Sequence, residues 1–113
     1  GVYEGGVIAP GISSSILNLS KSTAALPVFK LKSNPRVFGK NTKDALNAGF
    51  FWGYQGLIVN IIKKINLKFK TKFKIILTGG YAVKFSKFIN NNSTIDKHIT
   101  IKGVMFIYEK LLK

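Results

Sequence analysis

The sequence predicts an α/β fold in which helices flank a mixed sheet. Short apolar segments rich in Val, Ile and Phe alternate along the chain with longer segments whose apolar residues recur at helical spacing. The chain has 113 residues, the length of one domain, and 46% of them are hydrophobic, which is enough to form a core. We therefore expect a single domain over residues 1–113 in which helices pack on a sheet.

The N-terminal part of the chain predicts two strands and a helix. Residues 3–8 are a short apolar run that ends at Ala9-Pro10-Gly11, a pattern typical of a strand closed by a tight turn. Residues 13–25 predict a helix that ends before Pro27, because proline cannot continue it. Residues 28–32 alternate apolar and basic side chains, which indicates a short edge strand.

A long helix is the clearest prediction from the sequence. Asn41 or Thr42 can cap its N-terminus, and Asp44 lies in the first turn, where the helix dipole favours an acid. We expect the helix to run to about residue 64. Small residues spaced 4, 4 and 3 apart share one face, where another backbone could approach closely; they are Ala45, Gly49, Gly53 and Gly56.

Residues 45–62 of this helix also allow a membrane-span interpretation. They carry no charge over about the minimum length of a span. Three polar residues, Asn47, Gln55 and Asn60, would need partners inside lipid, and lysines flank both ends, so we favour a packed helix.

The C-terminal part predicts two further strand–helix pairs. Residues 73–77 form an apolar strand that ends at Thr78-Gly79-Gly80, where the glycines let a ligand approach the backbone beside a helix start. A helix over 81–88, a polar loop over 90–93 and a brief strand within 94–100 follow. Residues 101–112 predict an amphipathic helix.

The charge of the chain is +14, which by itself indicates a nucleic-acid or anionic-membrane partner. Arg36 is the only arginine, however, and the lysines are scattered rather than gathered. Ile, Asn, Phe and Tyr are also abundant and share A/T-rich codons with lysine, so a low-GC genome explains the excess. We expect neither a nucleic-acid partner nor a membrane partner.

Few side chains in this sequence suit catalysis. The absence of cysteine excludes disulfides, thiolate metal sites and cysteine nucleophiles, and His98 is the only histidine. Of the four acids, Glu4 and Asp96 lie near the ends of predicted strands, but nothing in the sequence pairs them. We expect no catalytic residue and no metal ligand within residues 1–113.

Several motifs in one order nevertheless resemble the C-terminal half of the type III pantothenate kinases. They are Gly5-Gly6-Val7-Ile8-Ala9-Pro10-Gly11, Ala25-Leu26-Pro27, Gly39-Lys40-Asn41-Thr42 with Ala45, Ala48-Gly49, Gly53-Tyr54 and Gly56-Leu57, then Leu77-Thr78-Gly79-Gly80-Tyr81-Ala82, and Ile99-Thr100-Ile101-Lys102-Gly103 before Ile107-Tyr108-Glu109. The resemblance covers almost the whole chain.

The resemblance implies a fold of the acetate and sugar kinase/Hsp70/actin superfamily, with a site between two ribonuclease-H-like halves. It implies ATP-dependent phosphorylation of pantothenate in coenzyme A biosynthesis by a cytoplasmic homodimer that requires Mg²⁺ and a monovalent cation, K⁺ or NH₄⁺. Thr42 matches the threonine that contacts pantothenate, and Thr78, Gly79 and Gly80 match the turn on the adenosine side. The small-residue face of the long helix falls where family members pair as dimers.

The phosphate loops and the catalytic aspartate of that family precede the segment matched here. We therefore expect residues 1–113 to be a C-terminal lobe fragment, an incomplete ribonuclease-H-like domain without two strands of its own sheet, and inactive alone. Two alternatives remain: a regulator of the Bvg accessory factor type on the same scaffold, and a basic nucleic-acid-binding module.

Overall fold

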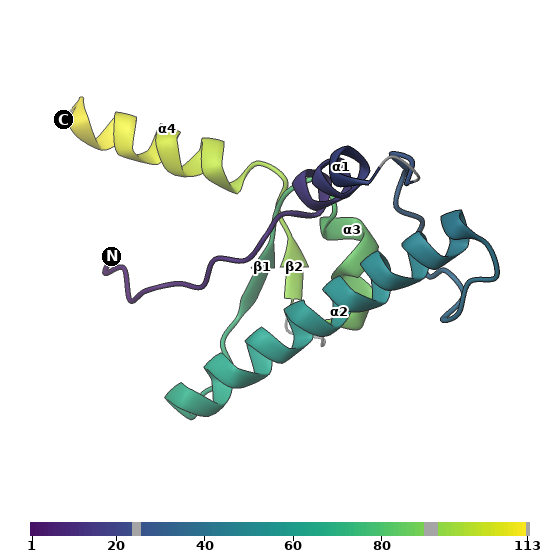
Figure 1. Cartoon of the computed structure of the whole chain (residues 1–113). Helices are drawn as coiled ribbons and strands as arrows, with labels where there is room; N and C mark the ends of the chain where they lie inside the picture. The colour runs from purple at the N-terminus through teal and green to yellow at the C-terminus, as the bar shows by residue number, and fades with distance from the viewer. Residues whose placement is uncertain (24–25, 90–92, 113) are drawn as a thin grey trace. The chain divides into compact units, whose positions relative to one another are not determined.

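A computed structural model describes residues 1–23, 26–89 and 93–112 and confirms the α/β class. The elements follow one another as α1 (Ile12–Ser22), α2 (Thr42–Phe69), β1 (Ile75–Leu77), α3 (Ala82–Phe85), β2 (Ser93–Ile95) and α4 (Ile99–Leu111), with a 3₁₀ turn at Ser86–Phe88 (Figure 1). The chain divides into two compact units, Gly1–Tyr54 and Gln55–Lys113, and α2 begins in the first and ends in the second.

Helix α1 confirms the predicted N-terminal helix, although it ends at Ser22, before residues 24–25, which lie outside the described residues. Its start is held to α2 by Tyr54. The Tyr54 hydroxyl donates to the Pro10 carbonyl at 2.9 Å and lies 2.9 Å from the Ser15 hydroxyl. Ile16 is buried, so the apolar side of α1 contributes to the core of the first unit.

Neither of the two predicted N-terminal strands forms, so the expected mixed sheet is wrong for the described residues. Residues 3–8 have no regular secondary structure and are exposed, and Ile8 is 100% exposed. Residues 28–32 are also irregular; there the Lys32 amide donates to the Asn47 side chain at 2.8 Å, where a strand would have bonded a neighbouring backbone. A strand needs a neighbouring strand to bond its backbone groups, and neither segment has such a neighbour among the described residues.

Helix α2 confirms the predicted long helix and extends it by one turn. Asn41 caps it: its side-chain oxygen accepts from the Asp44 amide at 2.9 Å, and its side-chain nitrogen donates to the Asp44 carboxylate at 3.0 Å. No proline or glycine interrupts residues 57–69, so the helix continues to Phe69. Lys70 then adopts φ 51°, and the Thr71 amide donates to the Asn66 carbonyl, which closes the helix end.

One face of α2 builds the core of the first unit. Asn47, Ala48 and Phe51 are buried there, and Phe51 is fully inaccessible. Leu31 is buried in the same unit, and the Phe29 ring meets Phe50 edge-on at a centroid distance of 5.4 Å. Throughout residues 1–23, 26–89 and 93–112, α2 included, no helix combines the length and apolar character needed to cross a bilayer.

The second unit contains a two-stranded parallel sheet. Strands β1 and β2 pair side by side in the register Ile75–Ser93, Ile76–Thr94 and Leu77–Ile95 (Figure 1). Helix α3 and the 3₁₀ turn connect them, as a parallel pair requires, and they confirm the helix predicted over 81–88. The core of this unit is Ala82, Phe85 and Ile89. Part of the predicted 90–93 loop, residues 90–92, lies outside the described residues.

Candidate functional site

The first candidate site is the start of α2, where Thr42 is the first helical residue. Because Asn41 caps the helix, the Thr42 side chain is not used as a cap, and it is exposed. The preceding Gly39 packs against the same turn so closely that a Cβ at this position would overlap the backbone of Asp44 and Ala45. Only glycine therefore fits this approach of the chain to the helix start.

A small cavity of about 180 Å³ lies beside this helix start and is lined by Lys32, Pro35, Arg36, Asp44 and Asn47. Asn47 is 1% exposed, and both ends of its side-chain amide are bonded: the oxygen accepts from the Lys32 amide, and the nitrogen donates to the Lys43 carbonyl at 3.1 Å. Two cations and the Asp44 carboxylate line the cavity, so its net charge is positive and suits a carboxylate or phosphate ligand. The sequence alone did not place Lys32 and Arg36 here, because this depends on how residues 26–38 fold back onto α2.

The second candidate site is the turn at Thr78, Gly79 and Gly80, which follows β1 directly. All three residues are exposed, and Gly79 adopts φ 96°, a conformation that glycine reaches without strain. The Gly79 carbonyl accepts from the Ala82 amide at 3.2 Å, so the turn leads straight into α3. The open backbone beside a strand end confirms the expected geometry of the turn, although no ligand contact follows from it alone.

Asp96 lies at the same edge of the sheet, because parallel strands place their carboxyl ends together. Its amide donates to the Leu77 carbonyl at 2.9 Å. Its carboxylate accepts from Lys102 Nζ at 2.9 Å and from the His98 amide at 3.0 Å. The hydrogen bonds from Lys102 and then His98 lower the pKa of Asp96 below its ordinary value. Asp96 therefore joins β2 to the start of α4, a structural role.

The small-residue face of α2 is exposed. Ala45, Gly49, Gly53 and Gly56 are all exposed, and a Cβ built on any of the three glycines meets no atom within 4 Å. This face lies opposite Asn47 and Phe51 on the helix, in accord with their spacing. Within the described residues, nothing packs on the face.

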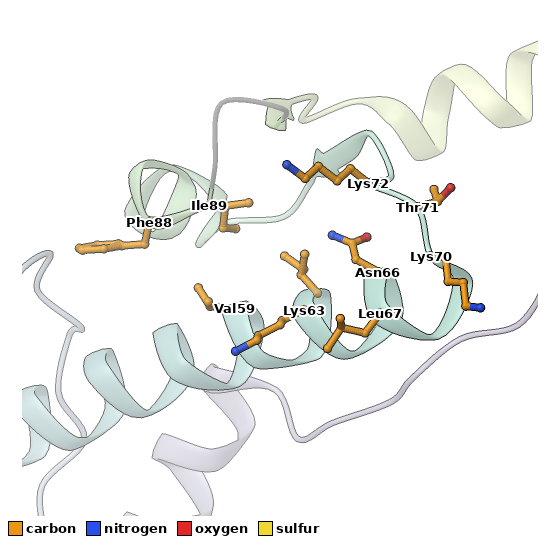
Figure 2. Close-up of a pocket in the computed structure, with 10 residues that line it drawn as sticks. Val59, Lys63, Asn66, Leu67, Lys70, Thr71, Lys72, Phe88 and Ile89 are labelled. Carbon is orange, nitrogen blue, oxygen red and sulfur yellow. The ribbon is translucent and has the colours of Figure 1, made fainter.

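The second unit also contains a larger open cavity of about 600 Å³. It lies between the C-terminal half of α2 and the segment at Phe88 and Ile89, with Lys70 and Lys72 beside it (Figure 2). Its apolar wall includes Val59, Ile62 and Leu67. Neither Thr42 nor the turn at Thr78, Gly79 and Gly80 lines this cavity, so the cavity is separate from the sequence-predicted site residues.

The last feature of the candidate site is the supply of side chains that could ligate a metal ion. In the part of the chain that the structure describes, no group of three or more His, Cys, Asp or Glu side chains could hold a metal ion. The resemblance places the phosphate loops and the catalytic aspartate before this segment, so no chemical step is derived through Mg²⁺ or a monovalent cation.

A glycine turn at the carboxyl end of a parallel strand is the arrangement in which α/β proteins often hold nucleotides and other phosphate ligands. Comparison with known proteins gives the family of the chain within this broad class of phosphate-binding α/β proteins. Residues 1–64 match the family model described as type III pantothenate kinase. The chain belongs to the type III pantothenate kinase family.

Individual relatives match over nearly the whole chain. The type III pantothenate kinase of Pelagibacter ubique is 48% identical over 103 residues, which are 91% of this chain and 42% of the relative. That of a Sulfurihydrogenibium species is 38% identical over 105 residues, 93% of this chain and 42% of the relative. That of Dehalococcoides mccartyi is 31% identical over 109 residues, which are 96% of this chain and 42% of the relative.

The chain thus spans about two fifths of the length of these relatives and matches their C-terminal part. None of these three is named as a regulator or a nucleic-acid-binding protein, so both alternatives considered from the sequence receive no support from them.

Proposed function

We propose that this chain is the C-terminal lobe of an enzyme that transfers the γ-phosphoryl group of ATP to pantothenate, giving 4′-phosphopantothenate and ADP in coenzyme A biosynthesis. The observation that carries the proposal is the family match over residues 1–64, together with 48% identity to a named type III pantothenate kinase. We expect the complete enzyme to be cytoplasmic and to need Mg²⁺ and K⁺ or NH₄⁺, held by residues outside this chain.

Thr42 contacts pantothenate in this proposal. Its hydroxyl is exposed at the start of α2, because Asn41 and not Thr42 caps the helix. Lys32 and Arg36 in the neighbouring cavity provide positive charge suited to the carboxylate of pantothenate. Thr42→Ala in the full-length enzyme should raise KM for pantothenate about tenfold, the effect of losing one hydrogen bond to a charged ligand, and leave KM for ATP unchanged.

The turn at Thr78, Gly79 and Gly80 contacts the adenosine side of ATP in this proposal. A side chain on Gly79 is strained at φ 96° and would occupy the open space beside the backbone. Gly79→Ala should therefore raise KM for ATP while KM for pantothenate stays unchanged. Gly103→Ala is the matched control, because Gly103 lies in a helix with no atom within 4 Å of an added Cβ.

The measurement is ADP release by the full-length enzyme with pantothenate and ATP varied in turn. A Thr42→Ala variant with unchanged KM for both substrates would contradict the assignment of Thr42. The 113-residue chain alone should release no ADP above background, and pantothenate-dependent release by it would refute its description as an inactive lobe. A full-length protein that phosphorylates no pantothenate would remove the proposed function altogether.

The exposed small-residue face of α2 forms the dimer interface in this proposal. Gly49, Gly53 and Gly56 leave space for a second helix to approach closely. Gly53→Leu should shift the full-length protein from dimer to monomer in sedimentation velocity, because the added side chain holds the two helices apart. Gly103→Leu, on α4, should leave the dimer intact. A Gly53→Leu protein that still sediments as a dimer contradicts this interface.

We also propose that the complete lobe has the ribonuclease-H-like sheet of the superfamily. Residues 1–113 then form its incomplete C-terminal part, and residues 3–8 become a strand when the preceding strands are present to pair with them. The exposed apolar residues of this segment, which pairs with no strand in the described residues, support this view.

A further inference from the structure

Helix α4 carries an apolar stripe that nothing in the described part of the second unit covers. The stripe consists of residues at helical spacing on one side of α4 and at its C-cap: Ile101, Val104, Met105, Tyr108, Leu111 and Leu112. Each of these side chains is between 51% and 80% exposed. Isolated helices of about this length are marginal in water, so α4 requires a packing partner in the native protein.

The other side of α4 carries an ion pair and a cation–π contact, and its apolar residues there are Phe106 and Ile107. Lys102 bonds Asp96 at 2.9 Å, and Lys110 lies 5.2 Å from the centroid of the Phe106 ring. Phe106, the exposed aromatic residue away from the stripe, is thus partly covered by a side chain of its own helix. The α4 stripe is the continuous apolar side of the helix, since the charged residues Lys102, Glu109 and Lys110 lie outside it.

The second unit cannot supply that partner by itself. Its described sheet has only the two strands β1 and β2, of three residues each, and Ile76 on β1 is 45% exposed. A sheet of this size offers too little apolar surface for a helix of 13 residues. The small sheet and the uncovered helix occur in the same unit, and both require apolar surface from outside that unit.

The relatives indicate which segment of the full-length protein provides this surface. This chain matches the C-terminal 42% of the Pelagibacter ubique protein, so more than half of that relative precedes the matched part. We propose that the α4 stripe packs against this preceding N-terminal segment in the full-length protein. The inference rests on the family membership and not on the proposed activity.

Two other occupants give different results in the same experiment. A second copy of the chain would cover the stripe only as protein concentration rises. A membrane surface would cover it only when lipid is added; the polar side of α4, with two lysines and one glutamate, lacks the dense basic charge typical of surface-binding helices.

The test uses the lack of cysteine in this chain. Val104→Cys places a thiol on the stripe, and Gly103→Cys places one in the same turn but outside the stripe, about 100° around the helix. Each variant is prepared as the 113-residue chain and as a full-length form, in which a cysteine-free version of the N-terminal segment of the Pelagibacter ubique protein precedes Gly1. Rates of labelling with a maleimide are then measured at several protein concentrations, with and without anionic vesicles.

In the 113-residue chain, both thiols should react rapidly. In the full-length form, labelling at position 104 should slow at least tenfold, independently of concentration and lipid, while labelling at position 103 stays rapid. Equal rates at 104 in the two forms would overturn the proposal, as would protection that appears only at high concentration or only with vesicles.

A second measurement keeps the test decisive if the fused form does not fold. The 113-residue chain, carrying an affinity tag, is co-expressed with the separate N-terminal segment. The chain should retain the segment, Val104→Asp should reduce retention at least tenfold, and Gly103→Asp should not. Failure of the tagged chain to retain the segment, or equal retention by both variants, counts against the proposal.

Discussion

Asn47→Ala tests how the first unit holds residues 26–38 against α2. The Asn47 side chain is 1% exposed and makes two hydrogen bonds, accepting from the Lys32 amide at 2.8 Å and donating to the Lys43 carbonyl at 3.1 Å. Alanine removes both. The helix itself does not depend on this side chain, so the change isolates the tie between α2 and the segment before it.

The expected loss of stability follows from these bonds. Two hydrogen bonds contribute about 2 kcal/mol net, since each is worth about 1 kcal/mol. Alanine gains roughly 0.5 kcal/mol of helix propensity over asparagine. The variant should therefore lose about 1.5 kcal/mol of unfolding free energy. Because Lys32 is exposed, water can reach its amide after the change, which keeps the loss below the penalty for a fully buried donor.

The single tryptophan, Trp52, reports on the same unit, because its Nε1 donates to the Pro35 carbonyl at 3.2 Å. Urea unfolding followed by its fluorescence should show the midpoint of Asn47→Ala lowered by about 1 M for a slope near 1.5 kcal/mol/M. Asn18→Ala is the control, since Asn18 is exposed in α1 and should change stability by less than about 0.5 kcal/mol. If the two variants unfold at the same midpoint, the reasoning is refuted.

Three further predictions concern packing and charge. Gly39→Ala should lose about 1–3 kcal/mol of unfolding free energy in the same urea assay, because its Cβ overlaps the backbone of α2. Gly49→Ala, where the added Cβ meets open space, should gain up to about 1 kcal/mol. Equal effects of the two substitutions would contradict the close approach at Gly39. Phe51→Ala should lose about 3–5 kcal/mol as a cavity opens in the core, and Phe38→Ala, at 82% exposure, less than about 0.5; similar losses would place Phe51 outside the core. The lowered pKa of Asp96 predicts a stabilising contribution that is complete above pH 3.8 and is lost as pH falls through the lower pKa of the folded state. NMR titration should show this lowered pKa, and Lys102→Ala should raise it toward 3.8. An unchanged pKa in Lys102→Ala would exclude Lys102 as the main cause of the shift.

The helices followed from the sequence because their signals are local. Asp44 and Asn41 mark the start of α2 within four residues, and apolar residues at helical spacing mark α1 and α4. Strand β1 and the turn at Gly79 could also be predicted, since an apolar run into a glycine pair leaves few other conformations. The end of α2 was placed one turn early because lysines near a helix end only favour termination and do not enforce it.

The candidate site was predictable only in part. The order of motifs from Gly5 to Tyr108 was enough to indicate the family that the comparison then established. Lys32 and Arg36 could not be assigned to the start of α2, because their position depends on a hydrogen bond between residues 15 apart in the chain. Asp96 was recognised only as lying near a predicted strand end. Its contact with Lys102 depends on α4 starting at Ile99, which places Lys102 beside it.

By itself, the sequence determined where the helices form, where a glycine turn follows β1 and which family the chain resembles. Only the tertiary structure decided that residues 3–8 and 28–32 are not strands, that the small-residue face of α2 is open and that the α4 stripe is uncovered. The physical reason is the range of the interactions. A helix satisfies its backbone within a few residues, whereas a strand or an apolar face is stabilised only by a partner distant in the chain.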